Sequence, residues 1–105
     1  MQSDDTPDAA YFCDMQALTP VQRERHGELA TQLRPQVDRF IELPDGYSAL
    51  FKRSLDDELT EFCALETLCC PFFSLVISQE EGVSRLTISG PGDIKPFIRS
   101  EFGIG

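Results

Sequence analysis

Apolar residues recur along this chain with two different spacings, and polar turn signals separate the segments that show them. The three-to-four-residue spacing of helices occurs in three segments, which are about residues 20–34, 55–69 and 93–102. The alternation of apolar and polar residues that is typical of strands occurs in four segments, which are residues 37–43, 47–53, 72–79 and 83–89. The predicted order is therefore α-β-β-α-β-β-α.

Capping and breaking residues mark the ends of the predicted helices. Thr19-Pro20-Val21-Gln22 is a capping box, in which Thr begins the helix and Gln follows three residues later. Pro35 should end that helix. Ser54 is the expected N-cap of the second helix, and Pro71 should stop it.

Two hairpins follow from the turn signals Pro44-Asp45-Gly46 and Glu80-Glu81-Gly82. Val37, Ile41 and Leu43 are expected to share one face of the first strand. Since both hairpins are antiparallel, the simplest fold is α+β, with one four-stranded antiparallel sheet and helices packed on one face. The order of the hairpins in the sheet is not readable from the sequence.

The length of 105 residues fits a single domain, which we assign to residues 13–105. Residues 1–12 are acidic and polar, and we expect a disordered tail there. This start lacks the basic and apolar regions of a signal peptide, and no apolar run approaches the ~18 residues of a membrane span. We therefore expect a cytoplasmic protein whose thiols stay reduced.

The chain carries 18 acidic and 9 basic residues, for a net charge of −9. Such a surface repels nucleic-acid phosphates and anionic membranes, so neither is an expected partner. The Gly90-Pro91-Gly92 loop lacks the Lys-Ser/Thr of a phosphate-binding loop, and no nucleotide cofactor is expected.

The residues best suited to metal binding or catalysis cluster at the end of the second predicted helix. Glu66 stands three and four residues before Cys69 and Cys70, a spacing that places its carboxylate beside both thiols. Adjacent thiols suit soft cations such as Hg(II), Cu(I), Zn(II) or As(III). Cys13 could reach the pair as a third thiol, or it could be a free thiol in a docked arm. The candidate metal ligands are therefore Cys69, Cys70, Cys13 and Glu66.

Two other residues of interest are assigned to structural roles. Cys63 lies among core positions of the second helix, which favours burial over ligation. His26 is the only histidine, and its polar neighbours predict a solvated surface position. The thiols at Cys69 and Cys70 could also be core residues, but a carboxylate on an apolar stripe is costly to bury without a partner.

The chain resembles a group of small, largely uncharacterised bacterial proteins. The shared segments are Cys-Asp, Leu-Thr-Pro, E-L-P-D-G-Y, E-x-x-C-C-P-F-F and a late G-P-x-x-x-K-x-F-I, found here at residues 13–14, 18–20, 42–47, 66–73 and 90–98. The pattern does not include Cys63. The resemblance implies an association with heavy-metal or arsenic resistance, without defining an activity.

Three functions remain open at this stage. The first is capture of a thiophilic heavy-metal ion as a buffer, sensor or carrier. The second is an enzyme with Cys69, Cys70 and Glu66 as catalytic residues. Such an enzyme would cleave carbon–mercury bonds by protonolysis, as organomercurial lyases do, or would run thiol redox or arsenate chemistry. The third is a small interaction module with structural cysteines, which could pair into a homodimer.

Overall fold

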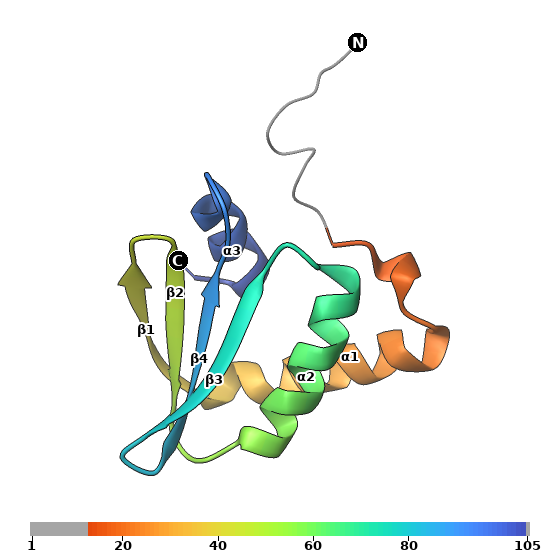
Figure 1. Cartoon of the computed structure of the whole chain (residues 1–105). Helices are drawn as coiled ribbons and strands as arrows, with labels where there is room; N and C mark the ends of the chain where they lie inside the picture. The colour runs from red at the N-terminus through yellow and green to blue at the C-terminus, as the bar shows by residue number, and fades with distance from the viewer. Residues whose placement is uncertain (1–12, 105) are drawn as a thin grey trace.

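A computed structural model describes residues 13–104 and confirms the predicted α+β fold (Figure 1). The predicted tail at residues 1–12 lies outside the described residues. The three α-helices and four strands follow one another in the order predicted, with short 3-10 turns before and after α1. Their bounds are η2 Met15–Ala17, α1 Pro20–Leu33, η3 Arg34–Gln36, β1 Val37–Leu43, β2 Gly46–Phe51, α2 Asp56–Cys69, β3 Ser74–Glu80, β4 Val83–Ser89 and α3 Ile94–Phe102.

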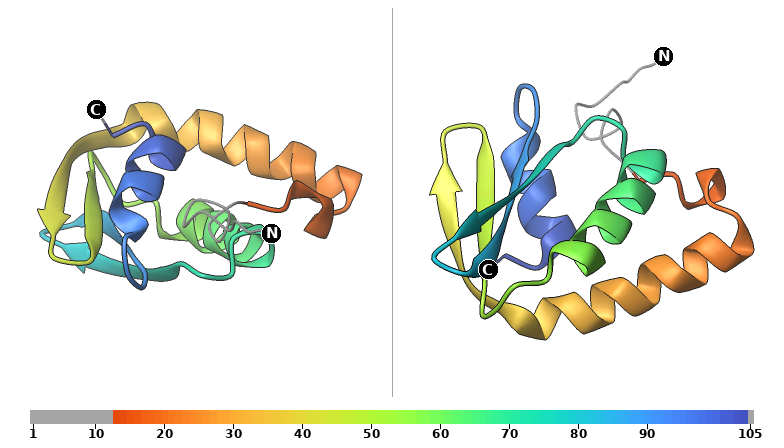
Figure 2. Two further views of the ribbon diagram at one scale, coloured as in Figure 1. Left: turned by 90° about the horizontal axis from the view of Figure 1, so that it is seen from above. Right: turned by 60° about the horizontal axis from the view of Figure 1, so that its bottom comes forward.

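The sheet has the strand order β1-β2-β4-β3, and every pair of neighbours is antiparallel. The two hairpins meet where β2 pairs with β4, with Ala49 opposite Leu86. Both of these residues are buried members of the core cluster. Figure 2 shows from two directions that the helices cover one face of the sheet. Val76 on β3 is 54% exposed, because it points to the opposite face. The helices thus lie on one face, as predicted.

The start of α1 is the predicted capping box. The Thr19 backbone N–H donates to Gln22 Oε1 at 2.8 Å, and the Gln22 N–H donates to Thr19 Oγ1 at 3.1 Å. These two bonds satisfy donors that a helix start otherwise leaves open. Leu29 and Leu33 form the buried stripe of the helix and pack it into the core.

The prediction that Ser54 caps α2 is wrong. The N-cap position is Leu55, whose N–H donates to Ser84 Oγ on β4 at 2.7 Å. Ser84 in turn donates to Asp56 Oδ1 at 2.6 Å. α2 therefore begins without a side-chain cap, and the contact with Ser84 fixes its start against the sheet.

The face prediction for β1 is wrong for Val37, while Ile41 and Leu43 share a face as predicted. A bulge between Val37 and Arg39 shifts the register, so that Val37 pairs with Phe51 while Phe40 pairs with Ala49. Since an inserted residue reverses the alternation, Val37 joins the core and Ile41 lies on the other face. A smaller difference is that β3 begins two residues later than predicted, at Ser74.

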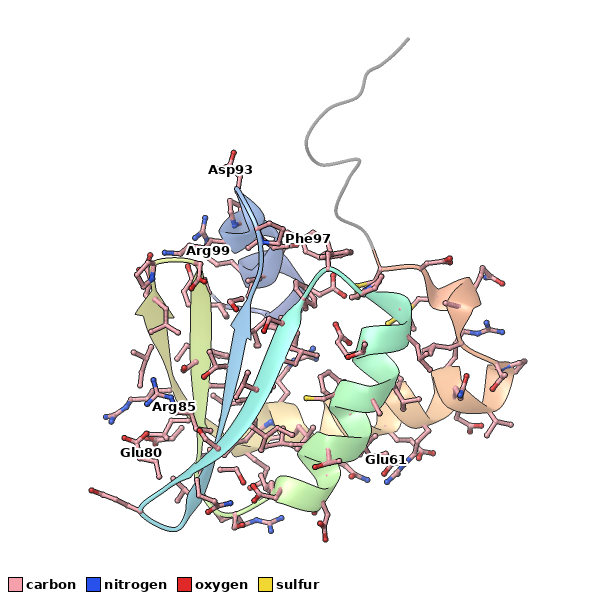
Figure 3. The ribbon with its side chains drawn as sticks, viewed as in Figure 1. Glu61, Glu80, Arg85, Asp93, Phe97 and Arg99 are labelled. Carbon is pink, nitrogen blue, oxygen red and sulfur yellow. A yellow bond between two sulfur atoms is a disulfide. The ribbon has the colours of Figure 1, made fainter. Side chains whose placement is uncertain are left out.

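Polar contacts hold α3 over the sheet. Arg99 Nη1 donates to the Tyr47 hydroxyl at 2.8 Å, and Lys95 Nζ donates to Glu42 Oε2 at 2.6 Å. Figure 3 shows Arg99 reaching from α3 toward the strands. Within residues 13–104, no helix has the length and apolar character needed to cross a membrane.

Candidate metal centre

Cys13 belongs to an arm that docks against the end of α2. The Asp14 N–H donates to the Cys69 carbonyl oxygen at 2.8 Å, which brings the arm to the last turn of that helix. Arg23 on α1 holds the next turn of the arm, because its Nη1 donates to two carbonyl oxygens, of Met15 at 3.1 Å and of Leu18 at 2.8 Å. The arm is therefore fixed to both helices just beyond Cys13.

Cys13 and Cys70 are joined by a disulfide, with their Cα atoms 4.7 Å apart. This differs from the expectation that all thiols are reduced. Of the four cysteines, Cys69 and Cys63 are the two that remain free. The Sγ of Cys69 lies 3.7 Å from that of Cys70, and both residues are sealed from solvent.

The sulfur atoms of Cys13, Cys69 and Cys70 all lie within 4.8 Å of one another. Of the two alternatives left open for Cys13, the structure therefore shows the one in which its sulfur reaches the pair. This trio, which we call the thiol cluster, could hold a metal ion in its reduced form. Cys63 joins none of the metal-capable groups found among residues 13–104, and it packs half-buried against the core.

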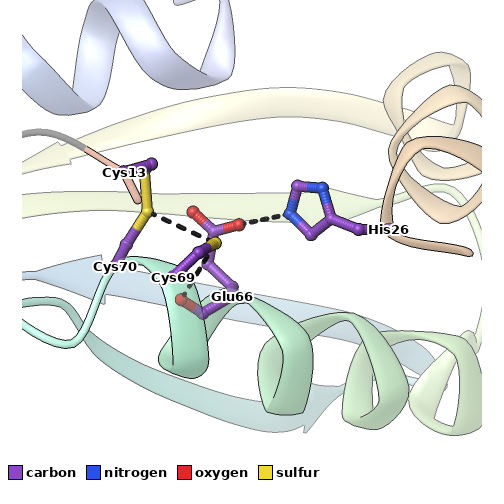
Figure 4. The surroundings of a disulfide bond; sticks show 5 residues. All are labelled: Cys13, His26, Glu66, Cys69 and Cys70. Carbon is purple, nitrogen blue, oxygen red and sulfur yellow. Dashed lines mark hydrogen bonds and ion pairs between the residues drawn. A yellow bond between two sulfur atoms is a disulfide. The ribbon is translucent and has the colours of Figure 1, made fainter. Parts of the chain in front are cut away.

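Glu66 lies beside the thiol cluster with only 2% of its side chain exposed. Its Oε1 is 2.7 Å from Nε2 of His26 on α1, and Figure 4 shows the carboxylate between the imidazole and the sulfurs. The His26 ring also stacks on Phe62, with ring centroids 5.1 Å apart. The buried carboxylate therefore has the partner that its burial requires.

The prediction that His26 is a solvated surface residue is wrong, because its side chain is only 15% exposed. A signal was present in the sequence. His26 stands three and seven residues before Leu29 and Leu33, so it continues the buried stripe of α1. Its polar neighbours in the chain belong to other faces of the helix.

A second carboxylate approaches from α3. The side chains of Cys13, Glu66, Cys70 and Glu101 form a group whose potential ligand atoms lie within 4.8 Å of one another. The sequence carried no signal for Glu101, because it lies far from the cysteines along the chain and only the packing of α3 brings it near. The site thus collects donors from the arm and from α1, α2 and α3.

Burial and negative charge disfavour thiolates at the end of α2. Burial raises the pKa of Cys69 to about 11, and the nearby charge of Glu66 adds to the effect. The same two causes raise the pKa of Cys63 to about 11. The pKa of Glu101 is also raised, because its carboxyl group loses hydration beside the site and faces Glu66. A free thiol here therefore keeps its proton at neutral pH until a cation displaces it.

No protein-family model, no curated protein and no solved structure matches this chain. The chemistry of the site therefore rests on its own geometry. Three overlapping groups in that geometry bring together three sulfurs, two carboxylates and one imidazole, which are ligand types for metal ions.

Proposed function

We propose that the reduced protein captures one thiophilic heavy-metal ion through Cys13, Cys69 and Cys70, with Glu66 as an oxygen ligand or an outer partner. The observation that carries the proposal is the convergence of three sulfur atoms within 4.8 Å. Two thiolates that share one ion through ~2.3 Å bonds lie about 3.8 Å apart. The Cys69–Cys70 sulfur separation of 3.7 Å agrees with that value.

Capture requires the reduced state, because a disulfide sulfur is a poor ligand. A cellular thiol reductant supplies two electrons and two protons to the Cys13–Cys70 bond and leaves two thiols in its place. Cys13 is the half-exposed member, so an incoming ion meets it first and is then passed to the buried Cys69 and Cys70. Each ligating thiol gives up its proton as the ion binds.

The chemistry of the donors indicates which ions fit. Three thiolates in a dry site select soft cations such as Hg(II), Cu(I) or As(III) over hard ones. A site that encloses a single soft ion suits a buffer, sensor or carrier of such an ion. The resemblance of the motifs to proteins associated with heavy-metal resistance agrees with this role, and it stays a prediction.

The test is a competition titration of the fully reduced protein with Hg(II), Cu(I) and As(III) against a small dithiol. We expect about one ion per chain, held more tightly than by the dithiol. The variants Cys13→Ser and Cys69→Ser should each lose at least tenfold in affinity. Cys63→Ser is the matched control, since it removes a free thiol of the same helix outside the cluster. Equal affinity in all four proteins would contradict the proposal.

A second candidate function is cleavage of a carbon–mercury bond, which the contact between Glu66 and His26 favours. The two residues form a hydrogen-bonded acid–base pair directly beside the thiols. In this reaction two thiolates hold the mercury of an organomercury cation, and the pair delivers a proton to the bound carbon. The carbon–mercury bond breaks, the hydrocarbon leaves, and Hg(II) stays on the sulfurs.

Turnover of phenylmercury separates this enzyme from a simple binder. The enzyme predicts release of benzene in more than one equivalent per chain when a small thiol removes the Hg(II) product. Glu66→Gln should abolish that release while Hg(II) binding persists. Binding of phenylmercury without benzene release would leave capture as the function.

A further inference from the structure

A second donor set shares the site and does not use the disulfide. It consists of His26 on α1 with Glu66 and Cys69 on α2, and their potential ligand atoms lie within 4.8 Å of one another. The closest pair is His26 Nε2 and Glu66 Oε1, at 2.7 Å. Because Cys13 and Cys70 take no part, the set is complete in the disulfide form that Figure 4 shows.

The three donors of this set are buried, unlike a chance cluster of side chains on the surface. The side chains of Glu66 and His26 are 2% and 15% exposed, and Cys69 is 1% exposed. Three groups that each gain from a polar partner are therefore enclosed together, away from competing water. They stand on two helices that pack against each other, so their positions do not depend on a loop.

The charge around the set favours a cation. The acidic groups that bear on it are Glu66 itself, Glu101 of α3 and Asp14 of the arm. His26 is the only basic side chain that pairs with any of the three within residues 13–104. A divalent ion among these groups would offset an excess of negative charge that the surrounding side chains leave uncompensated.

The donor types select a different ion from the thiol cluster. One imidazole nitrogen, one carboxylate oxygen and one thiolate sulfur form a mixed set, which suits borderline divalent ions such as Zn²⁺ and Co²⁺. An ion bound to both Nε2 and Oε1 through ~2.0–2.1 Å bonds would hold them about 3.3 Å apart. The pair therefore needs to open by only about 0.6 Å, which a rotation of either side chain supplies.

We propose that the disulfide form of this protein binds one borderline divalent cation, such as Zn²⁺, through His26 Nε2, the Glu66 carboxylate and Cys69 Sγ. Three protein ligands leave the fourth tetrahedral position to water. The two sites share Glu66 and Cys69, so the chain holds one ion at a time. The redox state of Cys13 and Cys70 then selects the class of ion, which is soft when they are reduced and borderline when they are joined.

The experiment uses the full chain in its disulfide form, with the Cys13–Cys70 bond verified by mass spectrometry and no reductant present. Co²⁺ is the probe, because a tetrahedral site with one thiolate gives visible d–d bands and a sulfur-to-cobalt charge-transfer band. We expect saturation at one Co²⁺ per chain and displacement by Zn²⁺. Cys69→Ser should lose the charge-transfer band, and His26→Gln should weaken binding at least tenfold.

Controls separate this site from the thiol cluster. Cys63→Ser should leave the Co²⁺ spectrum and affinity unchanged. His26→Gln should weaken Co²⁺ binding by the disulfide form much more than Hg(II) or As(III) binding by the reduced form, since only the first site takes a ligand atom from His26. If the thiol cluster is not a soft-ion site but the present proposal holds, the reduced wild type should bind soft ions weakly. The disulfide form should then still bind Co²⁺.

A readout on the wild-type protein covers the case in which a variant does not fold. The chain has a single histidine, so its ring signals in an NMR spectrum report on His26 alone. Stoichiometric Zn²⁺ should shift those signals in the disulfide form. Unshifted signals, a Co²⁺ spectrum without the charge-transfer band, or equal Co²⁺ affinity in a folded His26→Gln variant would each overturn the proposal.

Discussion

Reducing the Cys13–Cys70 disulfide should remove a large part of the free energy of unfolding. The bond closes a loop with a sequence separation of 57 residues. In the chain-entropy account, a loop of that length restricts the unfolded chain by about 14 cal/mol/K, which is about 4 kcal/mol at 25 °C. Small domains have only about 5–15 kcal/mol of stability in total. A loss of this size should therefore be easy to measure.

The value is an upper estimate, because an unfolded chain with residual structure gains less entropy on reduction than a random coil does. The folded state itself should change little. The Asp14–Cys69 backbone bond and the two contacts of Arg23 do not depend on the disulfide. We therefore expect a loss of about 3–4 kcal/mol. Since 1 kcal/mol shifts Tm by about 4–8 °C in a domain of this size, Tm should fall by roughly 12–30 °C.

The assay is urea unfolding followed by circular dichroism, with and without a strong reductant. Cys13→Ser should show the low stability under both conditions, while Cys63→Ser should keep the full difference between them. A soft ion added to the reduced wild type at one hundred times its Kd should restore about 2.7 kcal/mol. A difference below about 1 kcal/mol, or an equal difference in Cys13→Ser, would contradict stabilisation by the Cys13–Cys70 bond.

Four further predictions concern single positions. Gly46→Ala should cost at least about 3 kcal/mol in urea unfolding, because its Cβ would stand 1.9 Å from the Ile88 carbonyl oxygen, and recovery of wild-type stability would contradict this. Gly27→Ala, with open space around its Cβ, should instead stabilise α1 by about 0.5–1 kcal/mol. Cys63, with a pKa of about 11, should react with iodoacetamide at pH 8 about 20-fold more slowly than an exposed thiol. Its smaller thiolate fraction slows the reaction ~240-fold, and its greater nucleophilicity recovers about tenfold. Soft-ion affinity should rise as pH rises from 6 to 9, because Cys69 must release a proton whose pKa is about 11, and a flat profile would contradict that release.

The order of the elements was readable because local signals define it. The Thr19–Gln22 capping box and the hairpin turns act between residues a few positions apart, so the sequence shows them directly. The sheet order was not readable, because it depends on the pairing of β2 with β4 across more than thirty residues. The contact of Ser84 with Leu55 at the start of α2 could not be predicted either, since its donor and acceptor come from segments distant in sequence.

Only the part of the candidate site that is local in sequence could be predicted. Glu66, Cys69 and Cys70 lie within one helical turn, and their spacing alone brings them together. His26 and Glu101 reach the site only through the packing of α1 and α3 against α2. A histidine that continues a buried stripe of leucines, however, could have been recognised before the fold was known.

Binding of one soft ion by three sulfurs is the basis of the proposed function. X-ray absorption spectroscopy of the reduced protein, loaded with one equivalent of As(III), counts the sulfur atoms around the ion directly. We predict three sulfur neighbours in the wild type and in Cys63→Ser, and two in Cys13→Ser. Two sulfur neighbours in the wild type, or a count unchanged by Cys13→Ser, would contradict the thiol cluster as the metal centre.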